Sequence, residues 1–274
     1  MVKAFVALLL STCALFAQFY HGHTPSTRKP VDTYTYKSED GVTTFFVVGY
    51  SNKTHTPTWT AFEIENPGKP VLSCERPSDF TPEPRANPVV VHTDYAASAG
   101  ATTYSRGHMV PNSAMAYWRG CEGNKATFIT SNIVPQLQAN NAGVWEALES
   151  AVAGKKRSGG AFDMGLIGRS KHVWVFAGPV YWGRTVDIEK ISPKEIWVPT
   201  ALWKTVIWID DKGEERTCSW IIPHRADIAR NAYMEYIVSI QDVYKKTGVN
   251  VLPTKTHPLY ARVDAQKFIP LGNE

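Results

Sequence analysis

The chain lacks most of the short motifs that identify common enzyme and metal-binding classes. Its four cysteines include no Cys-x-x-Cys pair and no Cys/His spacing, which argues against a zinc site. It contains no Gly-x-Ser-x-Gly motif, which argues against a serine hydrolase of that type. It also contains no internal repeat and no low-complexity tract. The sequence therefore indicates a globular protein that belongs to none of these classes.

No apolar run reaches the roughly 18 residues of a membrane-spanning helix. The longest run follows Lys3 and extends from Ala4 to Ala17, with only two hydroxyl residues inside it. This length is typical of a signal-peptide core. We therefore expect residues 1–17 to be a signal peptide and the protein to be secreted or held in the secretory lumen. A signal anchor or import into an organelle is the alternative.

Charge alone does not indicate a partner. The formal net charge is +4, and it becomes +3 when Lys3 leaves with the signal peptide. Such a small excess would not by itself suggest a nucleic-acid partner. A local cluster, residues 155–157 (Lys-Lys-Arg), is either a solvated loop or part of a phosphate-contacting groove, and the sequence leaves both readings open.

Three cysteines remain outside the signal segment, namely Cys74, Cys121 and Cys218. Three cannot all pair within one chain, so we expect one disulfide and one free thiol, and the sequence does not identify the pair. The 257 residues left after removing 17 from 274 are enough for one large domain or two merged lobes. We divide them into a leader with the first strands, residues 18–57, and a main domain, residues 58–274.

Strand patterns dominate the secondary-structure expectation. A run of six prolines within residues 66–88 predicts a long surface loop. The remaining expectations are strands over 33–64 with a turn at Asp40-Gly41, a short strand at 126–130, a strand at 172–181, a hairpin of 202–209 with 216–222, and a helix from 227 to 248. Long strands mixed with helices, without a βαβ rhythm, predict an α+β fold with a central antiparallel sheet flanked by helices.

The most informative segment begins at Tyr104-Ser105-Arg106-Gly107-His108. Cutting a phosphodiester requires a base that activates water and a positive charge that meets the developing negative charge. A histidine has an ordinary pKa of about 6.5, so His108 is a credible base near neutral pH. Arg106 lies two residues away, and both side chains leave the same face of an extended segment.

A helix is expected from Asn141 to about Ala153, ended by Gly154. Asn141 and Glu149 share one face of this helix with Trp145, and a second, apolar stripe would dock the helix on the core. Magnesium accepts few protein ligands and keeps several waters, so a single asparagine oxygen is a reasonable ligand. Each residue alone also has a structural explanation, such as a helix cap for Asn141.

The ordered set resembles the DNA/RNA non-specific endonucleases, whose active site is a ββα-metal finger. The family pattern is Asp-Arg-Gly-His, then Asn-x-x-Pro-Gln, then Asn-x-Gly-x-Trp and Leu-Glu. The matching positions are Arg106-Gly107-His108, Asn132 with Pro135-Gln136, Asn141 to Trp145, and Leu148-Glu149. Further similarity at residues 177–181, 196–204 and 242–248 extends the resemblance over roughly residues 58–255. Residues 58–274 are therefore expected to be an endonuclease domain.

The resemblance implies a role for each matched residue. His108 becomes the general base and Asn141 the direct magnesium ligand. Glu149 becomes an outer-sphere carboxylate that holds water near the metal, and Arg106 contacts the phosphate or the transition state. Asn132 matches a position of the catalytic set that supports the geometry of the site.

Arg76 lies where members of the family often carry a substrate-binding arginine, within a looser match. Gln136 is expected to be a structural hydrogen-bonding residue.

One position departs from the pattern, because Ser105 stands where the family usually has aspartate. A serine forms hydrogen bonds but carries no charge, so it cannot raise a neighbouring pKa as a carboxylate would. Because the base and the metal ligand are both kept, we interpret the protein as an active enzyme with an altered pH optimum, substrate preference or metal affinity. We therefore expect Ser105→Asp to shift the pH profile of activity. The resemblance implies a Mg²⁺-dependent endonuclease acting on DNA and RNA, with Mn²⁺ as a substitute metal, and the expected signal peptide implies that it is secreted. The alternative is a catalytically impaired nucleic-acid-binding protein on the same scaffold.

Overall fold

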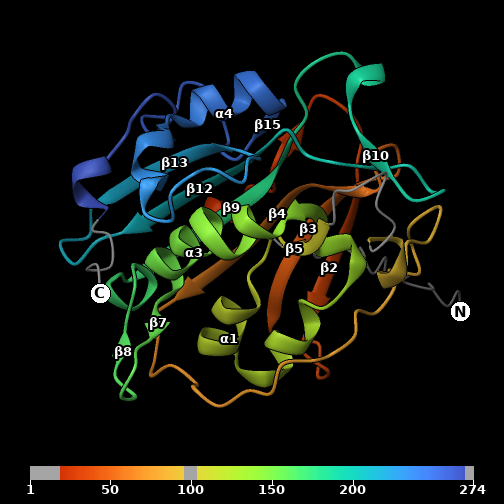
Figure 1. Cartoon of the computed structure of the whole chain (residues 1–274). Helices are drawn as coiled ribbons and strands as arrows, with labels where there is room; N and C mark the ends of the chain where they lie inside the picture. The colour runs from red at the N-terminus through yellow and green to blue at the C-terminus, as the bar shows by residue number, and fades with distance from the viewer. Residues whose placement is uncertain (1–18, 96–103, 269–274) are drawn as a thin grey trace, which may run out of the picture.

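A computed structural model of the chain describes residues 19–95 and 104–268, so the expected signal peptide lies outside the described residues. Seven strands form one antiparallel sheet in the order β14-β13-β12-β9-β4-β3-β2 (Figure 1). Their bounds are β2 (Asp32–Lys37), β3 (Thr44–Ser51), β4 (Thr56–Glu65), β9 (His172–Val180), β12 (Ala201–Ile209), β13 (Glu215–Pro223) and β14 (Ile237–Val238). The predicted α+β fold with a central antiparallel sheet is confirmed.

Both faces of the sheet are covered, which explains why its central strands are apolar without alternation. Every residue of β9 after His172 is buried. On one face, α1 (Asn112–Ala126) and α3 (Glu146–Ala153) supply buried side chains to a core with β3, β9 and β12. On the opposite face, α4 (Ile240–Thr247) packs its own core against the same strands (Figure 1). The helices thereby protect the sheet from water on both sides.

Short elements surround this layered body. Two-stranded ribbons are formed by β1 (Ser26–Thr27) with β15 (Val249–Asn250), β10 (Lys190–Ile191) with β11 (Ile196–Trp197), β5 (Tyr104–His108) with β6 (Ile133–Leu137), and β7 (Lys155–Lys156) with β8 (Phe162–Asp163). Besides α2 (Gln138–Asn140) and the wide π-helical turn η4 (Asn141–Trp145), single 3-10 turns occur at Tyr20–Gly22, His92–Tyr95, Thr130–Asn132, Ile167–Arg169, Thr185–Asp187, Ala232–Tyr236 and Ala265–Lys267.

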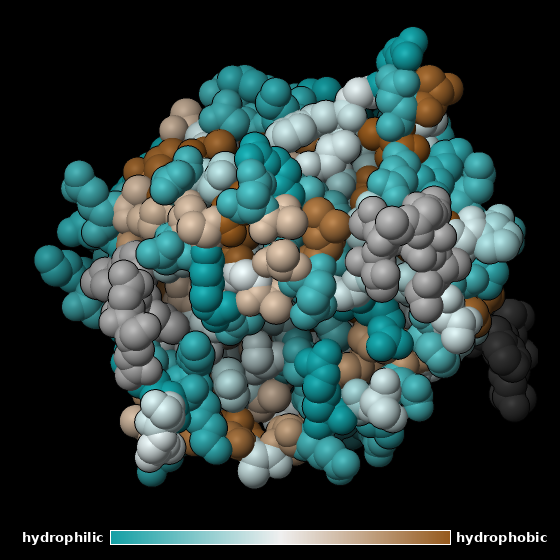
Figure 2. Space-filling model, viewed as in Figure 1, coloured by the Kyte–Doolittle hydropathy of each residue, from teal (hydrophilic) through white to brown (hydrophobic). Residues whose placement is uncertain are grey.

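Hydrophilic residues cover most of the face drawn in Figure 2, and apolar residues appear there only in small groups. None of the helices within residues 19–95 and 104–268 combines the length and the apolar content needed to cross a membrane. Trp174, Trp208 and Trp220, on three neighbouring strands of the sheet, are all buried.

The predicted hairpin of residues 202–209 with 216–222 is confirmed, as β12 and β13. β12 and β13 pair along their whole length, and the backbone N–H of Gly213 donates to Asp210 O in the turn between them. Gly213 has a φ of 84°, a left-handed conformation that favours glycine at this turn position.

Two predicted elements are wrong. Residues 126–130 do not form a strand: backbone hydrogen bonds from Thr127 and Phe128 to the last turn of α1 close this segment, and only Ile129 makes a bridge, to Thr81. The helix expected from 227 begins only at Ile240. Residues 237–238 pair with β13 instead, and the Ser239 capping box sets the start of α4. Its end at Gly248, a left-handed cap, is as predicted.

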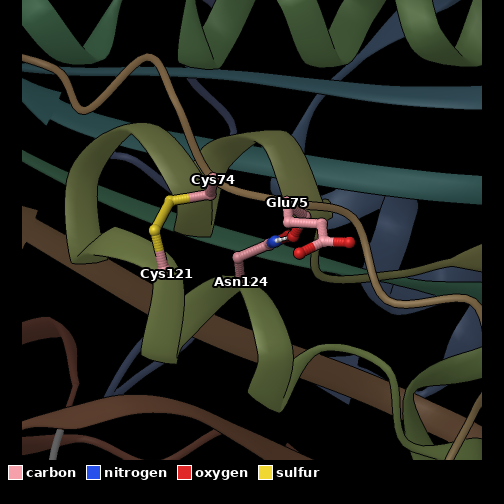
Figure 3. The surroundings of a disulfide bond; sticks show 4 residues. All are labelled: Cys74, Glu75, Cys121 and Asn124. Carbon is pink, nitrogen blue, oxygen red and sulfur yellow. Dashed lines mark hydrogen bonds between the residues drawn. A yellow bond between two sulfur atoms is a disulfide. The ribbon is translucent and has the colours of Figure 1, made fainter.

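The proline-rich loop is attached to α1 by a disulfide between Cys74 and Cys121, which leaves Cys218 as a buried free thiol (Figure 3). Beside the bridge, the side-chain amide of Asn124 donates to Glu75 O at 2.9 Å. The expectation of one bridge and one free thiol is met. Because Arg76 follows two residues after Cys74, the bridge also restricts the position of that arginine.

Replacing both bridged cysteines by serine should lower the free energy of unfolding by about 2–4 kcal/mol, because the bridge closes a loop of 47 residues in the unfolded chain. Urea denaturation of the double variant measures this loss. Cys218→Ala, which removes the thiol that is not bridged, is the control. Equal stability of the double variant and the parent would show that the bridge does not contribute.

Candidate active site

β5 and β6 form the ribbon that carries the histidine motif, with Ser105 opposite Gln136 and His108 opposite Ile133. Gly107 faces Gln136 so closely that a Cβ added there would lie 2.7 Å from the Gln136 Cβ. A side chain at this position would therefore push the two strands apart. The glycine in the motif is therefore a packing requirement of the ribbon.

His108 is the last residue of β5, and its ring lies against two phenylalanines. The ring centres are 5.2 Å from Phe80 and 4.9 Å from Phe128. The residue is 7% exposed, and its Nε2 is buried without a hydrogen-bond partner within the described chain. Burial, reinforced by Arg76 and Arg106, lowers its pKa to about 3. His108 is therefore neutral at pH 7 and able to accept a proton.

The two phenylalanines also support two arginines. The Arg106 guanidinium carbon lies 4.7 Å from the centre of the Phe80 ring, and that of Arg76 lies 5.1 Å from Phe128. Arg76 also donates to Asn112 Oδ1 at 3.1 Å. Burial and the charge of Arg106 lower the pKa of Arg76.

Neither guanidinium forms an ion pair with a carboxylate of residues 19–95 or 104–268. The site thus groups a neutral imidazole with two cations that lack an internal counter-ion. This is the charge arrangement that an oxyanion such as a phosphate would complete.

Asn132 is fully buried and uses its amide on the backbone. Its Oδ1 accepts from Val110 N at 2.8 Å, and its Nδ2 donates to Val110 O at 3.0 Å and to Thr127 O at 3.1 Å. The Asn132 carbonyl also accepts from Met109 N. Asn132 thus holds the two residues that follow His108, Met109 and Val110, by hydrogen bonds to their backbone.

The helical segment after β6 carries the other predicted site residues. It begins at α2, widens into the π turn η4 around Gly143, and continues as α3 to Ala153. Gly154 ends it with a φ of 93°, as predicted. The wide turn was not predicted, and it changes the angular spacing between Asn141 and Trp145. Turns of this type are frequent at functional sites.

Asn141 points back to the ribbon. Its Nδ2 donates to Ser105 Oγ at 3.2 Å, and Ser105 Oγ in turn donates to Gln136 O at 2.8 Å. These two hydrogen bonds fix the orientation of the Asn141 side-chain amide, and they do not use its oxygen, Oδ1. Within the described part of the chain, the half-buried Asn141 Oδ1 accepts no hydrogen bond. A neutral oxygen held in this way fits a magnesium ion that retains most of its waters.

No group of three or more His, Cys, Asp or Glu side chains gathers around a common point in residues 19–95 and 104–268. A metal held by several carboxylates or by a histidine cluster therefore has no candidate site in that part of the molecule. The amide oxygen of Asn141 and the carboxylate of Glu149 are the two oxygen donors that the predicted site offers.

Glu149 lies two turns after Asn141 and is largely buried. Its Oε1 is 3.6 Å from Nζ of Lys204, which is 1% exposed and lies 4.4 Å from the centre of the Trp145 ring. Burial raises the pKa of Glu149 to about 7, although Lys204 opposes this shift. Burial also lowers the pKa of Lys204. A cation bound beside Glu149 would favour the ionised carboxylate.

Lys204→Met should decrease phosphodiester cleavage, the activity that the resemblance implies, by about tenfold at pH 7, and raising the pH should restore part of it. Without the lysine the pKa of Glu149 rises above 7, so a smaller fraction is ionised at neutral pH. The pH–activity curves of the parent and of Lys204→Met show whether activity follows the ionised fraction of Glu149. Lys212→Met, in the β12–β13 turn, is the control. A decrease that does not depend on pH would show that Lys204 acts through packing alone.

Several contributors were not singled out from the sequence. Phe80 and Phe128 hold His108 and both arginines, but an isolated phenylalanine carries no signal for such a role. Lys204 was only the last residue of the matched segment 196–204. Asn140 joins the helix to β13, because its Nδ2 donates to Pro223 O and Arg225 O and its Oδ1 accepts from Gln136. The structural role expected for Gln136 agrees with this contact.

The fold and the site define a protein with an antiparallel sheet on which a two-stranded ribbon and a following helix present a histidine, two arginines and an asparagine. The family model described as DNA/RNA non-specific endonuclease matches residues 27–256. The chain belongs to this family.

Individual relatives agree with that assignment. The mitochondrial nuclease EXOG of Xenopus laevis is 29% identical over 219 residues, which cover 75% of this chain and 56% of that protein. A nuclease of Nostoc sp. is 24% identical over 231 residues, which cover 80% of this chain and 76% of that protein. This chain therefore spans little more than half the length of the EXOG protein.

Among solved structures, that of EndoG in complex with EndoGI has a similar fold. The TM-score is 0.60 with 21% identity, and the match covers 81% of this chain and 86% of that chain.

Proposed function

We propose that this protein is a Mg²⁺-dependent endonuclease that hydrolyses the phosphodiester bonds of DNA and RNA with little specificity for sequence or sugar. The observation that supports it best is the grouping of Arg76, Arg106 and a neutral His108 on Phe80 and Phe128. Asn141 reaches the same ribbon at Ser105, three residues before His108. The candidate base and the candidate metal ligand are thus attached to the same two-stranded ribbon.

In the proposed reaction, His108 accepts a proton from the attacking water as the new phosphorus–oxygen bond forms. Arg106 and Arg76 contact the non-bridging oxygens and offset the charge that develops on them. Asn141 Oδ1 would hold the metal, whose chemistry is Lewis-acid stabilisation of the leaving oxygen. Glu149 would accept hydrogen bonds from water around the site. The bond to the leaving oxygen breaks and that oxygen takes a proton from solvent water, giving one phosphate end and one hydroxyl end; His108 later releases its proton to solvent.

Incubating the purified protein with plasmid DNA and with RNA tests this proposal. We expect both to be cut when Mg²⁺ is present, no cutting in EDTA, and recovery when Mg²⁺ or Mn²⁺ is added back. Binding of both nucleic acids without cutting in any metal would support the impaired binding protein instead. Cutting that persists in EDTA would contradict the proposed metal dependence.

Ser105→Asp should reduce the Mg²⁺ concentration for half-maximal activity several-fold. A carboxylate would accept from Asn141 Nδ2 and add negative charge beside the metal ligand, although it could not donate to Gln136 O. The pH profile, expected from the sequence to shift, should change less, because Ser105 contacts Asn141 and not His108. Mg²⁺ titrations and pH profiles of both proteins measure these effects. Ser105→Ala is the uncharged control; equal Mg²⁺ dependence of all three proteins would contradict the coupling.

We also propose that residues 1–17 direct the protein into the secretory pathway and are removed. The Cys74–Cys121 disulfide supports this, because such bridges persist mainly in oxidising compartments. Expression in a eukaryotic cell followed by mass spectrometry of the protein in the medium should find an N-terminus near Gln18. Retention of Met1 or recovery from an organelle would contradict the proposal.

A further inference from the structure

A second concave site lies where β9 ends, apart from His108 and Asn141. It is a cavity of about 500 Å³. Its walls come from residues 27–31, from the β3–β4 connection, from the chain after β9, and from the end of α4. Binding pockets for small ligands have volumes of about 300–1,000 Å³, so this cavity is large enough for one.

The charged residues that line this pocket all carry the same sign. They are Arg28, Lys29, Lys53 and Lys246, each of them exposed, and no aspartate or glutamate lines the cavity. Within residues 19–95 and 104–268 none of the four forms an ion pair with a carboxylate. Arg28 instead donates to the Tyr244 hydroxyl at 3.3 Å. Four cations around one cavity favour an anionic ligand.

Aromatic rings stand beside two of these cations. Lys53 Nζ lies 5.8 Å from the centre of the Trp197 ring, and Lys246 Nζ lies 5.7 Å from that of Trp182, which is 39% exposed. Tyr181 and Trp197 also line the cavity. A simple inorganic anion would use only the cations. A nucleotide would use both features, because its phosphate is anionic and its base has a flat face that stacks on aromatic rings.

One short segment connects this pocket with the active site. Trp197 lines the pocket, while its neighbours Ile196 and Val198 belong to the apolar cluster that contains Phe80 and Phe128. Alternate residues of an extended segment point to opposite sides. Residues 196–198 thus face the pocket on one side and, on the other, the apolar cluster whose Phe80 and Phe128 contact His108.

We infer that this pocket binds a nucleotide unit through its phosphate and base, at a position remote from the cleaved bond. The inference rests on the proposed function, since it identifies where a substrate strand or a released nucleotide makes a second contact. The same chemistry is available from either source. Lys53 and Lys246 supply charge to the phosphate. The rings beside them, the largely buried Trp197 in the cavity wall and the exposed Trp182, supply aromatic surface for the base.

Calorimetric titration of the intact protein with deoxyadenosine monophosphate, in EDTA, tests the inference. The double variant Lys53→Glu/Lys246→Glu should bind at least tenfold more weakly than the parent, and both positions are exposed, so the fold should be kept. Lys212→Glu, at the opposite end of β12, should bind within twofold of the parent. Arg106→Ala identifies any separate binding event in the active site. Inorganic phosphate should bind the parent more weakly than the nucleotide.

Equal affinity of the parent and the double variant for the nucleotide would overturn the inference, as would equal affinity of the parent for phosphate and nucleotide. A short single-stranded oligonucleotide distinguishes the two sources. If the nucleotide belongs to a strand, the oligonucleotide binds more tightly than the monophosphate, and the double variant raises KM without lowering kcat. If it is a free nucleotide, both ligands bind alike and KM is unchanged.

This result is separable from the proposed function. Failure of the parent to cut plasmid would defeat the nuclease proposal while leaving the titration valid. Equal binding by the double variant would defeat the pocket while leaving plasmid cleavage valid.

Discussion

His108→Ala is expected to decrease metal-dependent cleavage of plasmid by about 10²–10⁴-fold, the usual contribution of a positioned general base. Binding should be retained, because Arg76 and Arg106 stand on Phe80 and Phe128 and not on the histidine. Single-turnover cleavage and a filter-binding assay measure the two effects separately. Full metal-dependent cutting by the variant would eliminate His108 as the base.

His108→Gln is the matched variant, because alanine leaves a space between Phe80 and Phe128 that could itself disturb the site. Glutamine fills more of that space but offers no nitrogen base. If both variants lose cleavage while binding persists, the loss comes from proton transfer. If only alanine loses it, packing of the ring is the cause.

The low pKa of His108 predicts how activity and stability respond to acid. With a pKa near 3 the free enzyme keeps a neutral base at pH 5, so kcat/KM should not fall near pH 6.5 on account of this histidine. In the unfolded chain the histidine takes up a proton below about pH 6.5, but in the folded protein only near pH 3. Stability is therefore lost as the pH falls between those values.

At pH 5 the loss amounts to about 2 kcal/mol relative to pH 7. Denaturation of the parent and of His108→Gln at both pH values should show that the variant lacks this loss. Glu149, whose pKa is raised to about 7, changes stability in the opposite direction over pH 4.5–7. Glu149 is present in both the parent and His108→Gln, so the difference between their pH-dependent stabilities is the contribution of His108.

Local signals in the sequence predicted much of the fold. The hairpin predicted for residues 202–209 with 216–222 is formed by β12 and β13, and the strand predicted at 172–181 is β9, the middle strand of the sheet. The errors occurred where tertiary contacts override local preference. Residues 237–238 are apolar enough for a helix, but they pair with an edge of the sheet, and the capping box at Ser239 starts α4 only afterwards.

The site was predictable where its residues are close in sequence or carry a motif. Arg106 and His108 are two residues apart on one strand, so their common orientation followed from strand geometry alone. The phenylalanine pair that joins them to Arg76 comes from segments 48 residues apart, and no pattern connects such positions. The contact between Ser105 and Asn141 is likewise tertiary, so the sequence linked Ser105 to the histidine, whereas the structure links it to the predicted metal ligand.

Asn141→Ala should raise the Mg²⁺ concentration for half-maximal cleavage by about 10–100-fold or more. Loss of a residue that only supports a metal ligand costs a factor of this size, and loss of the ligand itself should cost at least as much. The variant removes the side-chain amide whose nitrogen bonds Ser105, and with it the candidate ligand oxygen. Arg76, Arg106 and His108 keep their contacts with Phe80 and Phe128. Cleavage measured over a series of Mg²⁺ concentrations gives the change. Electron paramagnetic resonance of added Mn²⁺ reports metal binding without depending on activity.

Gln138→Ala is the matched control, since Gln138 is an exposed amide on the same helical segment and its side chain forms no hydrogen bond with the described residues. It should leave the metal dependence unchanged. Asn141→Asp separates charge from geometry: a carboxylate oxygen at this position should bind Mn²⁺ at least as tightly as the amide, even if cleavage is slower. Equal Mn²⁺ affinity of the parent and Asn141→Ala would remove Asn141 as the ligand. It would also move the search for the metal to Glu149, the other oxygen donor of the site.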